Sequence, residues 1–219
     1  MTKASLPSDD ALTNEGLSSL RPEASVRLIA CGALAREVLA LIESNGWTHM
    51  DLQCLPAIYH NHPEKITPAV EAAVATARDA GFQQVFVVYA DCGTGGLLEA
   101  ACKRLGVDLI KGPHCYAFFD GVEAFAERAE DEMTSFYLTD FLVRQFDAFV
   151  WRPLGLDRHP ELRDMYFAHY ERLVYLAQTD DPALIAEAQE AAERLKLDFV
   201  WRRTGYGDLA TALSGVAGH

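Results

Sequence analysis

Three cysteines and one histidine stand where apolar segments of this sequence stop. Cys31 ends VRLIAC, His60 follows LPAIY, Cys92 follows VFVVYAD, and Cys115 follows LIKGPH. Thiolate and imidazole groups are ligands that zinc, iron and iron–sulfur clusters prefer. A set of three sulfurs and one nitrogen suits a tetrahedral ion. The pattern therefore predicts a metal site, with zinc first and iron or an iron–sulfur cluster as alternatives. His62 is the alternative to His60 as the nitrogen ligand.

Strands that alternate with helices are expected to position these side chains. This alternation predicts an α/β fold with an open, mainly parallel sheet and helices on both faces. Ligands of such sheets bind outside the carboxyl ends of the strands, so neighbouring ends would bring the four groups to one crevice. The expected strands are 26–32, 51–61, 83–93 and 107–115, and the expected helices are 33–47, 63–81, 95–106 and 117–131.

The second half of the sequence continues the alternation less regularly. Strands are expected at 135–139, 172–179 and 197–205, with helices at 140–155, 160–174, 182–196 and 206–216. We therefore expect a single α/β domain over 26–219, with two lobes of one compact unit that meet near residue 135. The polar segment 1–25 is interpreted as a flexible lead-in.

The residues around Cys92 add a second prediction. Gly93, Gly95 and Gly96 would let the chain turn from a strand into a helix and approach a cofactor closely. The N-terminus of that helix would stabilise the Cys92 thiolate. The segment matches neither GxGxxG nor GxxxxGK[ST], so it does not predict nucleotide binding.

Two carboxylates are candidates for moving a proton or orienting the histidine. Glu37 lies one turn into the first expected helix, and Glu64 begins the second. A solvated helix face is the alternative interpretation of both. Packing is likewise the alternative for any single cysteine, and it is the interpretation of Cys54 and Cys102.

Composition limits the classes of partner. The chain has 219 residues and a formal net charge of −13, which argues against binding to nucleic acid or to an anionic membrane surface. No stretch of about 18 apolar residues predicts a membrane span, and the first residues do not resemble a secretory signal. Five cysteines, an odd number, argue against a disulfide framework. We expect reduced thiols and a cytoplasmic location.

Four motifs resemble those of one protein family. LIACGALAREV, LPAIYHNHPEKI, VYADCGTGG and HCYAFF occur in the order found in the uncharacterised bacterial and archaeal family known as domain of unknown function 1638. The resemblance extends over most of residues 26–206. It implies a role near corrinoid-dependent methyltransferases of methylated-amine metabolism. Many members have YGxCG where this chain has YADCG. The positions that match the family motifs are Cys31, Glu37, His60, Cys92, Gly93, Gly95 and Cys115.

Three functions follow as hypotheses. The first is a metal-binding enzyme or accessory factor in one-carbon metabolism, linked to corrinoid-dependent methyl transfer. The second is a non-catalytic metallochaperone, or a binding partner of a corrinoid or tetrapyrrole. The third is a metal-free thiol enzyme with Cys92 as nucleophile and a histidine as base. The expected partner is a small-molecule substrate or a corrinoid protein, and the sequence leaves a homo-oligomer open.

Overall fold

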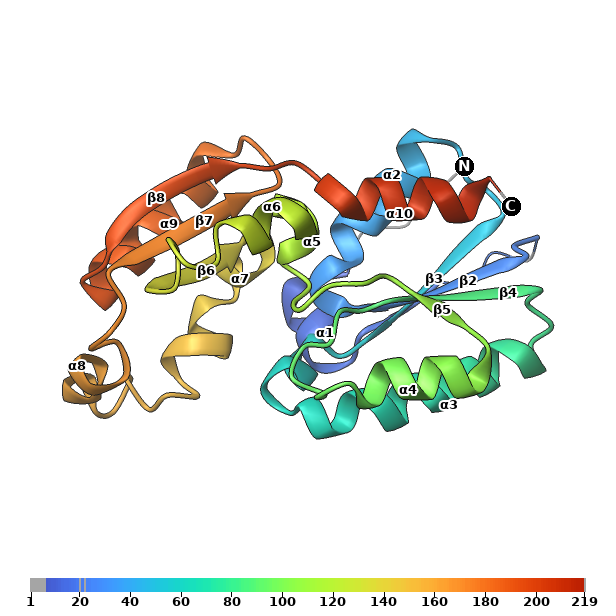
Figure 1. The fold of residues 1–219 in the computed structure, drawn as a ribbon, viewed down its shortest axis with the longest axis horizontal. Helices are drawn as coiled ribbons and strands as arrows, with labels where there is room; N and C mark the ends of the chain where they lie inside the picture. The colour runs from blue at the N-terminus through green and yellow to red at the C-terminus, as the bar shows by residue number, and fades with distance from the viewer. Residues whose placement is uncertain (1–6, 20, 22, 219) are drawn as a thin grey trace. The chain divides into compact units, whose positions relative to one another are not determined.

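The computed structural model describes residues 7–19, 21 and 23–218, and its chain forms two compact units (Figure 1). Unit 1 comprises Met1–Cys115 and Leu209–His219, and unit 2 comprises Tyr116–Asp208. Unit 2 is therefore inserted into the chain of unit 1. Of the predicted lead-in 1–25, residues 1–6, 20 and 22 lie outside the described residues. The rest of that segment contains a short helix, α1 (Asp9–Asn14), and a short strand, β1 (Leu17–Ser18).

Unit 1 is built on a five-stranded sheet with the order β1-β3-β2-β4-β5. β1 pairs with β3 in the antiparallel direction, and all other pairs are parallel. The strands after β1 are β2 (Val26–Cys31), β3 (Met50–Leu55), β4 (Gln84–Val88) and β5 (Asp108–Leu109). The helices after α1 are η1 (Gly32–Leu34), α2 (Ala35–Ser44), η2 (Ala57–Asn61), η3 (Pro63–Lys65), α3 (Ile66–Asp79), α4 (Leu97–Leu105) and α10 (Gly207–Ala217).

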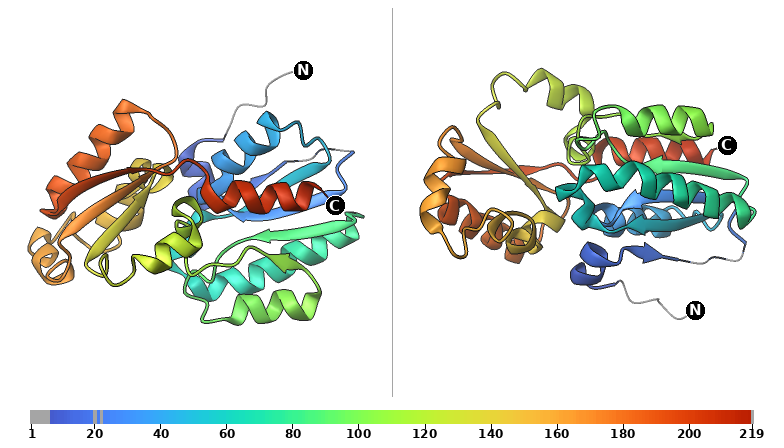
Figure 2. Two further views of the ribbon diagram at one scale, coloured as in Figure 1. Left: turned by 45° about the horizontal axis from the view of Figure 1, so that its top comes forward. Right: turned by 90° about the horizontal axis from the view of Figure 1, so that it is seen from below.

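Helices cover both faces of this sheet, which explains the apolar strands. Every residue of β2 is buried, because β2 lies in the middle of the sheet between two helical layers. α2 and α10 lie on one face, and α3 and α4 run side by side on the other (Figures 1 and 2). The buried stripe of α3, which includes Ile66, Val70 and Val74, faces the sheet.

The strand order defines where a ligand site is expected. The chain moves from β2 outward to β3, and then returns to place β4 on the other side of β2. The direction of strand addition thus reverses between β2 and β4. In doubly wound sheets the carboxyl ends of the two strands at such a reversal open a crevice. Cys31 ends β2, and the segment from Tyr89 to Cys92 follows β4.

Unit 2 contains a separate three-stranded sheet, entirely parallel, with the order β6-β7-β8. In Figure 1, α6 lies in front of this sheet and α9 behind it. The strands are β6 (Ser135–Thr139), β7 (Arg172–Ala177) and β8 (Asp198–Arg203). The helices are α5 (Ala117–Asp120), α6 (Val122–Glu127), α7 (Asp140–Arg144), η4 (Asp147–Trp151, a π-helix), η5 (Pro160–Leu162), α8 (Arg163–Tyr166) and α9 (Pro182–Leu195).

A buried carboxylate joins two strands of unit 2 at their carboxyl ends. Asp140, which follows β6, is 1% exposed. It accepts hydrogen bonds from the Tyr175 hydroxyl (2.7 Å), the Gln178 N–H (2.9 Å) and the Thr179 hydroxyl (2.6 Å). Because several donors satisfy this carboxylate, it fixes the β6–α7 junction against the end of β7.

The prediction of an α/β fold with mainly parallel, open sheets and flanking helices is confirmed. The details differ where special residues stop an element. β3 ends at Leu55 because Pro56 has no N–H to continue the sheet, and β5 has only two residues. The helix predicted at 117–131 is divided at Gly121, whose φ is +85°. Within the described residues, no helix is long and apolar enough to cross a membrane.

Candidate functional site

Two cysteines predicted as metal ligands meet beyond β4 and β5. The sulfur of Cys92 lies 3.1 Å from the sulfur of Cys115. The backbone explains the contact, because the two segments continue side by side after the strands end. The Asp91 N–H donates to the Gly112 carbonyl (3.1 Å), and the Cys92 N–H donates to the Pro113 carbonyl (3.2 Å). The short β5 thus still places Cys115 beside Cys92.

Cys31 brings a third thiol to this edge of the sheet. It ends β2, one residue beyond the pair formed by Ala30 and Val88. Burial raises the pKa of Cys31 to about 12, against an opposing hydrogen bond from the Ala33 backbone, and the neighbouring Cys92 adds to the increase. Cys31, Cys92 and Cys115 therefore form one group, the thiol cluster.

The two sulfurs in contact have opposite acid–base character. The pKa of Cys92 is lowered, first by the hydrogen bond from the Cys115 thiol and then by backbone N–H groups of Cys115 and Ala90, against burial. The same shared proton raises the pKa of Cys115 well above the ordinary thiol range, and burial raises it further. Cys92 is therefore the thiol of the pair that loses its proton more readily, and Cys115 is its hydrogen-bond donor.

A tyrosine hydroxyl is buried next to the thiol cluster. Tyr89 is 2% exposed, and its hydroxyl interacts with the Cys31 thiol, whose pKa this hydrogen bond lowers against the larger effect of burial. Burial raises its pKa well above the ordinary value, and Cys31 and Cys115 contribute next. The Tyr89 hydroxyl therefore lies on the Cys31 side of the thiol cluster.

The loop that carries Cys92 is held by Asp91. Its carboxylate accepts hydrogen bonds from the Gly96 N–H (2.7 Å), the Gly95 N–H (3.2 Å) and the Thr94 hydroxyl (2.8 Å). Gly96 is the N-terminal cap of α4. The sequence predicted that this helix terminus would stabilise the Cys92 thiolate, but the Asp91 carboxylate takes that place.

The predicted glycines have backbone conformations that favour glycine. Gly93, Gly95 and Gly96 have φ of +83°, +61° and +83°. Cys92 itself has a φ of +46°, which is uncommon for a residue with a side chain. A strained conformation of this kind is maintained by surrounding structure and is typical of functional sites. The hydrogen bonds to Asp91 supply that structure here.

His60 is paired with a second histidine, His114. His60 lies on η2, beyond the end of β3, and reaches the surface. Its pKa is lowered by the protein atoms that displace water around it and then by the charge of His114. The pKa of His114 is also lowered by burial, against the opposing charge of Asp91. Both rings are therefore neutral near pH 7, and His114 connects the pair to the Cys92 loop.

The two predicted carboxylates differ in position. Glu37, on α2, is only 5% exposed and lies near Cys54, whose pKa is raised by burial, by Cys31 and by Glu37. The Glu64 side chain is 68% exposed and lies 3.5 Å from the Nδ1 of His62. Glu37 is thus buried near the thiol cluster, whereas Glu64 is exposed to solvent.

Sequence reasoning missed three residues of this region. Asp91 had a recognisable signal, because Asp before a Gly-rich turn often accepts backbone hydrogen bonds. Tyr89 was read as part of an apolar strand. His114 was noted only as the neighbour of Cys115. Its link to His60 depends on η2, which the sequence did not predict.

Only part of the predicted ligand set lies close together in the structure. Cys92 and Cys115 are close enough to share an ion. Among the residues that the structure describes, however, no three Cys, His, Asp or Glu side chains are close enough together to hold one.

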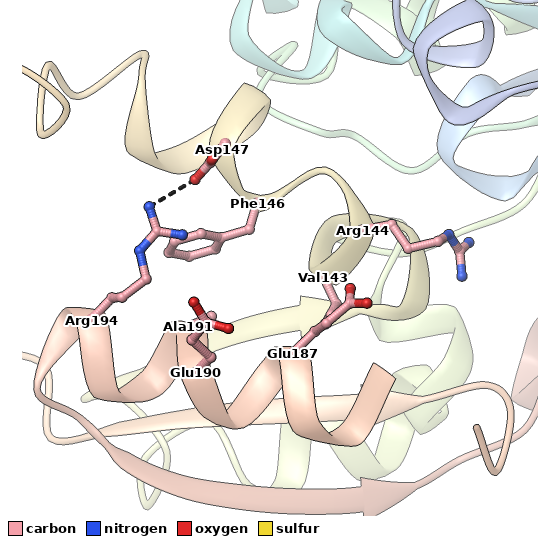
Figure 3. A pocket seen from close by; sticks show the side chains of 8 residues that line it. All are labelled: Val143, Arg144, Phe146, Asp147, Glu187, Glu190, Ala191 and Arg194. Atoms are coloured by element: carbon pink, nitrogen blue, oxygen red, sulfur yellow. Dashed lines mark hydrogen bonds and ion pairs between the residues drawn. The ribbon is translucent and has the colours of Figure 1, made fainter. Parts of the chain in front are cut away.

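Two hollows in the described part of the chain have no cysteine of the thiol cluster in their lining. A hollow of about 140 Å³ between α4 and the segment after β5 is lined by Asp91, Glu99 and Lys111 and by apolar groups. A hollow of about 180 Å³ in unit 2 lies between α9 and the region from α7 to η4 (Figure 3). Its Arg194 is paired with Asp147 at 2.8 Å and stacks on Phe146. It contains no residue that the sequence predicted for the site.

A comparison with protein families identifies this chain. The sequence profile of a family described as proteins of unknown function, DUF1638, matches residues 54–213. The chain belongs to the DUF1638 family. The part matched to DUF1638 includes His60, Cys92 and Cys115, whereas Cys31 and Glu37 precede it. No curated protein and no solved structure matches the chain.

Proposed function

We propose that this chain binds a soft metal ion through the thiolates of Cys92 and Cys115, with Cys31 as a third sulfur donor. The observation that supports this proposal most directly is the 3.1 Å contact between the sulfurs of Cys92 and Cys115. The contact lies at the carboxyl edge of a parallel sheet, where the strand order reverses between β2 and β4.

The donor chemistry fits such an ion. Thiolates select zinc, iron and copper(I) over hard cations. Two thiolates on one tetrahedral zinc, each at about 2.3 Å, lie roughly 3.8 Å apart. The Cys92 and Cys115 sulfurs would therefore separate by less than about 1 Å. Cys31 would have to turn toward them to complete a set of three, and a histidine would supply a fourth ligand.

The surrounding residues prepare the pair for this role. A thiol must lose its proton to become a ligand, and the low pKa of Cys92, set first by the Cys115 hydrogen bond, favours that loss. The neutral His60 and His114 can bind an ion or accept the second proton. Glu37 lies on the buried side of the cluster. A bound zinc ion would act as a Lewis acid toward water or a substrate oxygen.

The metabolic context is part of the same proposal. The family resemblance associates this chain with corrinoid-dependent methyl transfer in methylated-amine metabolism. A soft thiolate site suits either a small-molecule substrate or a corrinoid protein as the partner. The five free cysteines are compatible with a reducing compartment, and the cytoplasm is therefore the location we propose.

A second candidate function is favoured by the acid–base asymmetry of the pair. Cys92 has a lowered pKa caused first by Cys115, and its backbone is strained. These features also suit a nucleophilic thiolate that attacks an electrophilic substrate without a metal. His114, next to Cys115 in sequence, would then be the base.

Metal content of cysteine variants tests the proposal. The chain would be purified without oxygen, and metal per chain would be measured together with the absorption spectrum. Cys92→Ser and Cys115→Ser should lose the ion, because a serine hydroxyl is harder and far less acidic than a thiol. Cys102→Ser is the matched control, since Cys102 is fully buried within α4 and outside the thiol cluster.

Two outcomes would contradict metal binding by the cluster. One is equal metal content in all three variants. The other is a wild-type chain that binds no metal after incubation with zinc or iron(II). In the second case, labelling by an electrophile that depends on Cys92 but not on Cys102 would favour the nucleophile.

A further inference from the structure

The arrangement of Cys92 and Cys115 also suits a covalent modification. We propose that these two residues are a modification site that forms a reversible disulfide when a low-molecular-weight disulfide reaches the pair. This inference goes beyond the metal proposal, because it requires neither an ion nor the third cysteine. It concerns the same two sulfurs, so its test is designed to give an answer whether or not the chain binds metal.

The backbone holds the two cysteines at a separation that a disulfide needs. The hydrogen bonds from the Asp91 N–H to the Gly112 carbonyl and from the Cys92 N–H to the Pro113 carbonyl hold the two segments side by side beyond the ends of β4 and β5. Neighbouring strands lie about 4.8 Å apart, and disulfides join residues whose Cα atoms lie about 4.4–6.8 Å apart. The sulfurs are 3.1 Å apart and must approach to about 2.05 Å. A side-chain adjustment of about 1 Å therefore suffices.

Accessibility distinguishes Cys115 from the other cysteines. Cys115 is partly exposed, whereas Cys92, Cys31, Cys54 and Cys102 are buried. A small disulfide can therefore reach the pair from the side of Cys115. Cys31 is near the pair but is held at the end of the central strand β2, all of whose residues are buried. We therefore expect the link between Cys92 and Cys115 rather than one that includes Cys31.

The reaction is an ordinary thiol–disulfide exchange in two steps. Cys115, the exposed thiol, loses its proton and attacks one sulfur of the reagent RSSR, which forms a Cys115–SR mixed disulfide and releases RS⁻. Cys92 then attacks the Cys115 sulfur as a thiolate and releases the second RS⁻. The two thiol protons end on the two RSH molecules. The pair loses two electrons, and one RSSR is reduced to two RSH.

The modification would also control the proposed metal site. A disulfide removes both thiolates that the ion would require, so the oxidised chain could not hold it. The two states would exclude each other, and reduction would restore the dithiol.

Peptide mapping after oxidation tests this proposal. The metal-free full chain would be incubated with oxidised glutathione, the remaining thiols blocked with N-ethylmaleimide, and the protein digested with trypsin. Cleavage at Arg78, Lys103 and Lys111 separates the peptide with Cys92 from the peptide with Cys115. The first peptide also contains Cys102, so the Cys102→Ser chain makes the assignment unambiguous. We expect a linked pair of peptides that dithiothreitol separates.

Two single-residue variants show whether the link requires both cysteines. Cys92→Ser and Cys115→Ser should keep a glutathione adduct on the remaining cysteine and form no link. The mapping of the wild-type and Cys102→Ser chains decides the question even if a variant at the pair fails to fold. A glutathione adduct that persists on wild-type Cys92 or Cys115, or a link to Cys31, would overturn the proposal. Because chelated protein is used, absence of metal binding does not affect this result.

Discussion

The carboxylate of Asp91 accepts a hydrogen bond of 2.7 Å from the backbone N–H of Gly96, five residues along the chain. This bond closes the loop that carries Cys92, and it ties the end of one strand to the start of α4. The loop therefore depends on a side chain that performs no chemistry itself.

Removal of that carboxylate should weaken unit 1 and loosen the Cys92 loop. The hydrogen bond from Gly96 is the main reason why the pKa of Asp91 lies below its usual range, with Thr94 and Gly95 contributing. Asp91→Ala should lower the free energy of unfolding by about 1–3 kcal/mol. Urea denaturation measures this change, and the alkylation rate of Cys92 reports the loop. Asp79→Ala, at an exposed position, is the control. A variant as stable as that control would show that the loop does not need Asp91.

A glycine next to Cys31 gives a second prediction. A Cβ at Gly32 would lie 2.3 Å from the Leu12 carbonyl oxygen, so α1 packs directly on the Gly32 backbone. Gly32→Ala should cost about 2–3 kcal/mol of stability, because neither backbone can move freely. Gly215→Ala is the matched control in α10, where nothing lies within 4 Å of the added atom. It should gain about 0.5–1 kcal/mol. Thermal and urea unfolding measure both, and equal effects would refute the close approach.

The acid stability of unit 2 gives a third prediction. Burial alone would raise the pKa of Glu132, but hydrogen bonds from Arg202 and Tyr137 hold it below the ordinary value. A lowered pKa in the folded state means that the unfolded chain binds the proton more tightly. The stabilisation is therefore complete above the unfolded pKa of about 4.3, and it is lost as pH falls toward the folded pKa.

Glu132→Gln tests this origin of the acid sensitivity. The variant should be less stable than the wild type near neutral pH, and its stability should fall less steeply below about pH 4.5. Urea midpoints between about pH 3 and pH 6 give both slopes. Glu130→Gln, at an exposed position, should retain the wild-type profile. Parallel profiles for wild type and Glu132→Gln would mean that other groups cause the acid sensitivity.

The sequence predicted the alternation of strands and helices well, because apolar runs and glycine stops are local signals. It also predicted that Cys31 ends a strand, whereas the strand expected to reach Cys92 ends at Val88, four residues earlier. It misplaced the ends of other elements. Pro56 stops β3 before His60, and the pairing of Asp91 with Gly112 continues beyond the two residues of β5. Such boundaries depend on partners that are distant in the sequence, so local patterns do not reveal them.

The contacts that define the site were the least predictable. The rule for strand ends predicted that Cys92 and Cys115 would approach each other together with Cys31 and His60. Which of these groups come into contact depends on the strand order, which no local signal contains. At the start of α4 the Asp91 carboxylate accepts hydrogen bonds from the N–H groups of Gly95 and Gly96. The sequence had predicted that the Cys92 thiolate would interact with this helix terminus instead. Periodicity identifies strands but does not show which strands pair. The sequence therefore did not predict that the strands of unit 2 form a separate sheet.

The insertion of unit 2 into unit 1 has a consequence for how the chain matures on the ribosome. Translation releases β2 to β5 early, but α10, whose Leu209, Leu213 and Val216 are buried, emerges only after all of unit 2. Unit 2 is continuous and can fold as soon as it leaves the exit tunnel. Until then, one sheet face of unit 1 is covered only in part, by α2, and its remaining apolar surface is exposed. A nascent chain that stalls before α10 would therefore be a natural client for a chaperone.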